Sequence, residues 1–99
     1  MSSINKLMKQ AMRAQQQAQE VEEAMANRTV EASSGGGAVK VVATCKGKLN
    51  SIKIEREAVD PEDIESLEDM VLLAVNNAVD EGQKIQTEEK IEHLRNFSW

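Results

Sequence analysis

The chain has 99 residues, a formal net charge of -5 and an aromatic content of only 2%. This length fits one domain, residues 1–99. No apolar run reaches the ~18 residues of a membrane-spanning helix, and no secretory signal is recognisable. A single cysteine, Cys45, excludes an internal disulfide. The sequence therefore predicts a soluble cytoplasmic protein without a membrane partner.

The charges are unevenly divided along the chain. Residues 1–53 contain eight Lys and Arg against four Glu, a balance of +4, whereas residues 54–99 contain four against thirteen acids, a balance of -9. Residues 1–19 contain no carboxylate. Because a partner feels charge within about 8–10 Å, the negative total leaves a polyanion open as a partner, provided that the two ends lie apart.

The first segment predicts a helix over residues 3–26. Good helix formers fill it, without Gly or Pro, and apolar residues recur at alternating spacings of three and four. This pattern is typical of a helix that lies along another helix. The seam consists of Ile4, Leu7, Ala11, Ala14, Ala18, Val21 and Met25.

Residues 27–56 change to a period of two and predict three short strands in an antiparallel meander, with one apolar and one polar face. Cys45 falls on the apolar face, which predicts a buried structural thiol rather than a nucleophile. "GGGAVK" at 35–40 resembles a phosphate-binding loop but lacks its spacing and runs into a strand, so we interpret it as a hairpin turn. Gly47 suits a second tight turn.

A second helix is expected over residues 61–92, with Asp60 as its N-cap and Pro61 at its first position. Gly82 is expected to weaken it. Residues 93–99 are interpreted as a tail that frays or docks through Phe97 and Trp99. The acids around the helix start favour capping and the helix dipole over a divalent cation site; they are Asp60, Glu62, Asp63 and Glu65.

The segment "MVLLAV" at 70–75 is apolar nearly all round the helix. One small sheet and one Ala-faced helix cannot cover it, so we expect a second subunit to do so. The fold class is therefore α+β, in the order α-β-β-β-α, as a homodimer. The expected dimer interface consists of Met70, Val71, Leu72, Leu73 and Val75.

Groups for enzyme chemistry are scarce. His93 is the only histidine, tyrosine is absent, and a nucleophile pair of Cys45 and His93 would need folding to bring them together. We therefore expect no catalytic residues, no metal site, no cofactor and no small-molecule substrate.

A basic face lies opposite the seam of the first helix, because Lys6, Lys9 and Arg13 fall within about 60° of one another. The first helix exceeds the length of the strands, so its N-terminal turns are expected to project. A solvated basic face is the plain alternative. With almost no aromatics for stacking, double-stranded DNA held by its phosphates is favoured over a single strand. The further candidates for DNA contact are Gln10, Gln16, Gln17, Lys40, Lys46 and Lys48.

Three stretches together resemble the YbaB/EbfC nucleoid-associated family: "NKLMKQAMRAQQQAQ", "GGGAVKVVATCKGKLNSIKIE" and "DPEDIESLEDMVLLAVNNAVDEG". The resemblance implies an intertwined dimer with two projecting first helices, DNA binding on the nucleoid, an effect on chromosome organisation or gene expression, and no catalytic residues. It places Lys6, Lys9, Gln10 and Arg13 toward DNA and residues 70–75 in the dimer body. The ending "TEEKIEHLRNFSW" departs from the family's Met- and Gly-rich tail. A protein-interaction module without DNA contact is the alternative function.

Overall fold

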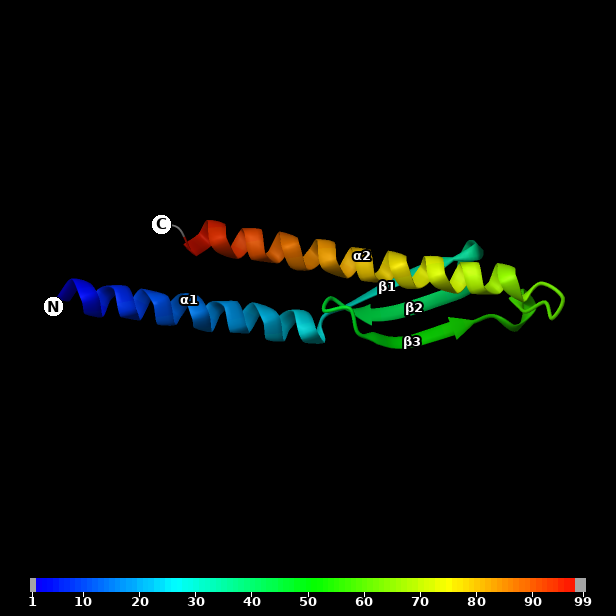
Figure 1. Ribbon diagram of the computed structural model, residues 1–99, viewed down its shortest axis with the longest axis horizontal. Coiled ribbons are helices and arrows are strands. Elements are labelled where there is room, and N and C mark those ends of the chain that lie inside the picture. The colour runs from blue at the N-terminus through cyan, green and yellow to red at the C-terminus, as the bar shows by residue number, and fades with distance from the viewer. Residues whose placement is uncertain (1, 98–99) are drawn as a thin grey trace.

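The computed structural model describes residues 2–97, and side chains for residues 3–95 (Figure 1). It confirms the order α-β-β-β-α. The helices are α1 (Ser2–Asn27) and α2 (Ile64–Phe97), and short 3-10 turns occupy Gly35–Gly37 and Arg56–Ala58. The strands are β1 (Thr29–Ser34), β2 (Val39–Thr44) and β3 (Leu49–Ile54).

The three strands form the expected antiparallel meander, in the order β1-β2-β3. Ser34 pairs with Val39 across the first turn, whose glycines 35, 36 and 37 have φ of +60°, +68° and +95°. This left-handed region strains any residue with a Cβ, which explains three consecutive glycines in a hairpin turn. The second turn uses Gly47, at φ +89°, as predicted.

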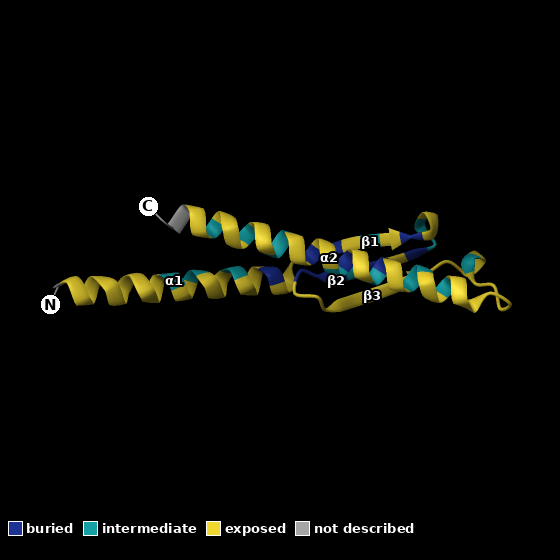
Figure 2. Cartoon of the chain, turned by 45° about the horizontal axis from the view of Figure 1, so that its top comes forward, coloured by how far each residue is buried: buried dark blue, intermediate teal, exposed yellow. Residues whose placement is uncertain are grey.

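The core lies between α2 and one face of the sheet, mainly over β1 and β2 (Figure 2). Alternate β2 residues Val39, Val41 and Ala43 are fully buried against Ala74 and Ala78 of α2. Small residues on the helix let its backbone approach the strands closely. Cys45, just beyond β2, is also buried in this core, as expected.

The start of α2 differs from the prediction. The helix begins at Ile64, and its cap is Asp63, whose carboxylate accepts hydrogen bonds from the Ser66 backbone N–H (3.3 Å) and hydroxyl (2.7 Å). Asp60 was the wrong cap because it closes a turn instead: its side chain accepts from Glu62 N–H, and its carbonyl from Asp63 N–H. Pro61 suits the second position of such a turn equally well.

The other end of α2 also differs from the prediction, because the helix continues through residues 93–97, five residues beyond the expected end. Residues 98–99 and the side chain of Phe97 lie outside the described part. At 34 residues, α2 is roughly 51 Å long, and its C-terminal half leaves the sheet and runs beside α1 (Figure 1). The molecule is therefore a rod of 74 × 18 × 16 Å.

Candidate nucleic-acid interface

The N-terminal part of α1 projects beyond the rest of the rod (Figures 1 and 2). Ala14 of α1 and Leu94 of α2 line the same groove, so the last described turns of α2 lie beside the middle of α1. Residues 3–13, here called the arm, are exposed throughout. The predicted projection is thus present, although α2 accompanies the second half of α1.

The arm carries three exposed cations, Lys6, Lys9 and Arg13, on one side of the helix. In the part of the chain that the structure describes, no carboxylate forms an ion pair with them. The next acid along α1, Glu20, is seven residues beyond Arg13, or roughly 10 Å along the helix axis. Their positive charge is therefore available to a ligand.

The glutamines on α1 divide into two groups. Gln10 and Gln16 are exposed beside the cations, as predicted. Gln17 is half-buried and lines the groove toward α2. Gln17 follows Arg13 by about one turn of the helix, so it lies at the edge between the basic side and the groove.

The three sheet lysines are not gathered with the arm. Lys46 Nζ lies 3.1 Å from Glu22 Oε1, so Lys46 already forms an ion pair with a carboxylate. The turn that holds Lys46 and Lys48 lies at the C-terminal end of α1, because Cys45 N–H donates to the Arg28 carbonyl at 2.9 Å. That point is roughly 20 Å from Arg13 along the helix. Lys40 lies a strand length further, opposite Ser33 and Lys53.

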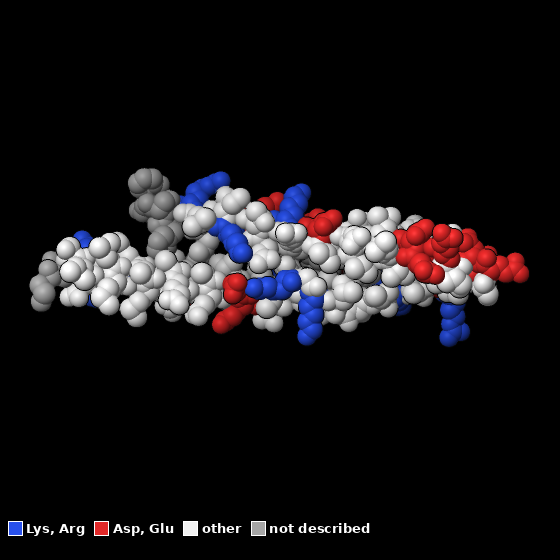
Figure 3. Space-filling view, viewed as in Figure 1, with Lys and Arg blue, Asp and Glu red and all other residues white. Residues whose placement is uncertain are grey.

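Carboxylates concentrate at the end of the rod opposite the arm (Figure 3). This acidic end is several Debye lengths of about 8 Å from the arm in a 74 Å molecule. A second acidic group, on the half of α2 beside α1, was not foreseen; there Glu89 Oε1 lies 3.4 Å from Arg28 Nη1. Among the described residues, no group of three His, Cys, Asp or Glu side chains is placed to hold a metal ion.

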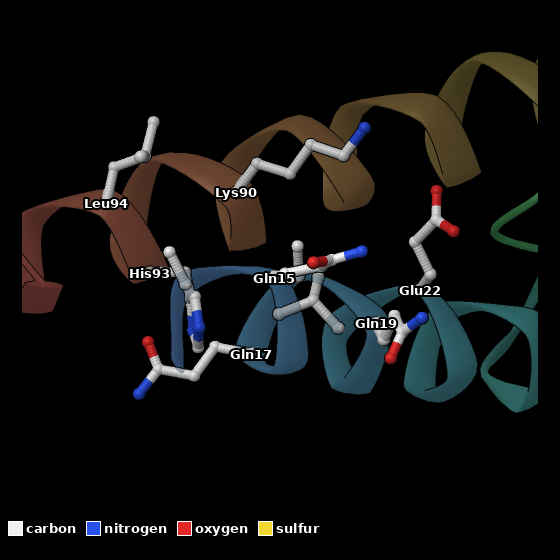
Figure 4. Close-up of a pocket in the computed structure, with 10 residues that line it drawn as sticks. Gln15, Gln17, Gln19, Glu22, Lys90, His93 and Leu94 are labelled. Carbon is white, nitrogen blue, oxygen red and sulfur yellow. The ribbon is translucent and has the colours of Figure 1, made fainter. Parts of the chain in front are cut away.

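An apolar groove of about 500 Å³ separates α1 from the C-terminal half of α2 (Figure 4). Its wall includes Ala14, Ala18, Val21 and Leu94, and the Nε2 atom of His93 is buried there without a hydrogen-bond partner. This groove was not predicted from the sequence, although the small residues in the seam of α1 were its signal. Cys45 lies beside Gly82 of α2. Gly82 precedes His93 by eleven residues, or roughly 16 Å along the helix, so folding does not bring Cys45 and His93 together as a nucleophile pair.

Within the described residues, neither helix combines the length and apolar character needed to cross a bilayer. The sequence model of the YbaB/EbfC DNA-binding family matches residues 1–96. The chain belongs to the YbaB/EbfC DNA-binding family. The resemblance found in the sequence is thereby confirmed across nearly the whole chain.

Relatives in the YbaB/EbfC family carry the name nucleoid-associated protein. One from Pelotomaculum thermopropionicum is 47% identical over 87 residues, covering 88% of this chain and 83% of its own length. One from Moorella thermoacetica is 48% identical over 89 residues, covering 90% and 86%. The crystal structure of the uncharacterized protein HP0035 from Helicobacter pylori has a TM-score of 0.71 at 21% identity, covering 81% of this chain and 84% of that one, and supports the fold.

Proposed function

We propose that this YbaB/EbfC protein is a nucleoid-associated homodimer that holds duplex DNA by its phosphates with little sequence preference. The observation that carries the proposal is the set of exposed cations Lys6, Lys9 and Arg13 on a projecting arm, without ion-pair partners among the described carboxylates. Lys and Arg side chains that neutralise phosphates give affinity regardless of sequence. Through such contacts the protein would influence chromosome organisation and gene expression.

The remaining candidates have unequal roles in this proposal. Gln10 and Gln16 are exposed next to the cations and can donate hydrogen bonds to phosphate oxygens. Lys48 is exposed but lies in the turn roughly 20 Å from Arg13, so it would make a separate contact, whereas Lys46 must first leave Glu22. Lys40 and Gln17 are the weakest candidates, because one is remote from the arm and the other is half-buried in the groove.

The proposed dimer surface lies where α2 leaves β3 uncovered. Ile54 pairs with Val39 and Ile52 with Val41, so these isoleucines share the apolar face of the sheet, yet Ile52 is 45% exposed. The Met70 carbonyl accepts the Ser34 hydroxyl at the end of β1. By helical geometry, the opposite flank of α2 therefore faces β3.

That flank carries Val75 and Leu72, and Leu72 is 60% exposed. Together with Ile52 and Ile54 they form the apolar patch that we propose a second copy covers. Among the expected interface residues, Met70, Val71 and Val75 pack partly against the core of their own chain, and Leu73 is exposed on the other flank. The chain's own sheet thus covers more of residues 70–75 than the sequence predicted, and the apolar patch is the surface that we propose for the partner.

Fluorescence anisotropy with a labelled duplex over a salt series tests the DNA contact. We expect a variant with Lys6→Glu, Lys9→Glu and Arg13→Glu to bind at least about tenfold more weakly, with a slope of log K against log salt that is shallower by ~0.9 per lost contact. The matched control reverses three exposed cations of the body, Lys53, Arg56 and Lys84, and so has the same net charge.

Equal affinity of the two variants would overturn the role of the arm. If neither variant nor parent binds DNA, while partners from lysate survive nuclease treatment, the protein-interaction function is favoured instead. Light scattering provides the second test, since the proposal requires a two-chain particle.

A further inference from the structure

The arm has an apolar side as well as a basic one. Ile4 and Leu7 are 61% and 65% exposed, and Met8 and Met12 beside them are exposed too. In Figure 3 the side of the arm turned to the viewer is almost free of charge, and only the edges of cations show. Ile4 and Leu7 continue the seam whose second half, Val21 and Met25, packs inside the protein. The seam is therefore a helix-packing surface that loses its partner where α2 ends.

The groove further along α1 is complementary to these side chains. Ala14 and Ala18 form its α1 wall, and their small side chains leave an apolar hollow of about 500 Å³ that Leu94 borders from α2. Large residues on one helix pack best against small ones on the facing helix. One helix thus carries two exposed large side chains and, ten to eleven residues later, an apolar hollow of matching character.

An antiparallel pair of arms brings the two features together. When Ala11 of one copy faces Ala11 of the other, Ile4 faces Ala18 and Leu7 faces Ala14, because each pair of residue numbers sums to about 22. The arrangement has a two-fold axis, so the same contacts form twice. The exposed side chains of each arm therefore pack against the groove of the other copy, and the surface is complementary to itself.

The charges fit this arrangement. Lys6, Lys9 and Arg13 lie about 150° around the helix from the seam, on the outer sides of the pair. Two helices are about 20 Å thick, so the two sets of cations are separated by more than the Debye length of about 8 Å.

We propose that the arms of two copies from different dimers pair in this antiparallel way, with Ile4 and Leu7 of each inserting into the α1–α2 groove of the other. The pair presents basic faces in opposite directions, so a particle of four chains can hold two DNA duplexes together. The bridging rests on the proposed DNA contact and the count of four chains rests on the proposed homodimer, whereas the contact between two arms rests on neither.

Sedimentation velocity of the full chain tests the pairing. We compare a knob variant (Ile4→Gln and Leu7→Gln), a groove variant (Ala14→Gln and Ala18→Gln) and a control at the acidic end, Val59→Gln, which changes an exposed apolar residue. Glutamine keeps helix propensity and leaves the charge unchanged. We expect the parent and the control to form four-chain particles, and the knob and groove variants to stop at two chains.

Mixing the knob variant with the groove variant sharpens the test. The intact knobs of one copy meet the intact groove of the other, so one of the two contacts returns and four-chain particles reappear in part. The pairing is overturned if the mixture stays at two chains, if neither variant changes the parent's mass, or if a variant dissociates the two-chain particle itself.

Capture of a second, labelled duplex on an immobilised one tests the bridging. We expect the knob variant to bind a single duplex with the parent's affinity but to lose at least about tenfold in captured duplex. Unchanged capture overturns the bridging, whereas loss of single-duplex binding by the parent itself would refute the proposed function instead. Cosedimentation with phosphatidylglycerol vesicles tests a lipid surface as the partner instead. If the groove variant cosediments and the knob variant does not, the apolar side binds lipid, and the pairing is overturned.

Discussion

Gly82 of α2 lies directly against Cys45 at the end of β2: a Cβ on Gly82 would stand 3.0 Å from the Cys45 Cα and 3.2 Å from the Thr44 carbonyl oxygen. Backbone atoms cannot yield as a flexible side chain can. The glycine that the sequence marked as a weak point is therefore the place where the helix crosses the strand most closely. Beyond this crossing α2 leaves the sheet and runs beside α1.

Gly82→Ala tests this relationship. Helix propensity alone predicts a gain of about 1 kcal/mol. Overpacking against the backbone costs about 1–3 kcal/mol, and we expect it to win. The melting temperature at fixed protein concentration should then fall by several degrees, since 1 kcal/mol corresponds to about 4–8 °C in a domain of this size. A rise in melting temperature would show that the strand moves aside easily.

Gly36→Ala tests the first turn through backbone conformation alone. Nothing lies within 4 Å of a Cβ at this position, but its φ is +68°. We expect a loss of about 1 kcal/mol in the free energy of unfolding, measured by urea denaturation. Gly36→Asn is the control, because asparagine tolerates the left-handed region and should lose less. Equal stability of the parent and both variants would contradict this explanation.

Asp63→Asn tests the cap of α2 through its pH dependence. The Ser66 hydroxyl, and then the Ser66 backbone N–H, lower the pKa of Asp63 below its usual 3.8. A lowered folded-state pKa means that the carboxylate stabilises the fold above about pH 3.8, and that this contribution is lost as pH falls through the folded-state pKa. The difference in the free energy of unfolding between parent and variant should therefore shrink as the pH falls from about 5 to about 2, because the Asp63 carboxylate becomes protonated over this range. Glu65→Gln controls for the loss of one charge.

Glu22→Gln releases Lys46 from its ion pair. The side chains of Lys46 and Glu22 are 35% and 58% exposed, so solvent screens the pair and we expect a change in stability below about 1 kcal/mol. Duplex affinity should rise, and the salt slope should steepen by about 0.9 if Lys46 gains one phosphate. Glu31→Gln on β1 removes the same charge without freeing a described lysine and serves as the control. An equal rise in duplex affinity in the two variants would show that the effect comes from net charge and not from Lys46.

Leu72→Gln combined with Ile52→Gln tests the proposed dimer patch. Both side chains are exposed in the single chain, so the variant should keep its helical circular dichroism. Loss of the apolar contact should shift the mass measured by light scattering from two chains to one. Leu73→Gln, on the other flank of α2, is the control. A two-chain particle in the double variant would place the dimer surface elsewhere.

The sequence alone determined the order of the elements, the meander and the basic side of α1, because these follow from local rules. Val39, Val41 and Ala43 alternate with a period of two, glycines punctuate the turns, and Lys6, Lys9 and Arg13 lie on one side of any α-helix. The family followed from motifs spread over the same elements.

The tertiary structure decided what depends on neighbours distant in sequence. Two aspartates could each cap α2, and only the turn at 60–63 selected Asp63. The partner of Lys46, the half-burial of Gln17 and the need for Gly82 are set by how α2 crosses the sheet and meets α1. Periodicity specifies which side of a helix is apolar, but the length and path of the neighbouring helix specify which part of that side stays exposed.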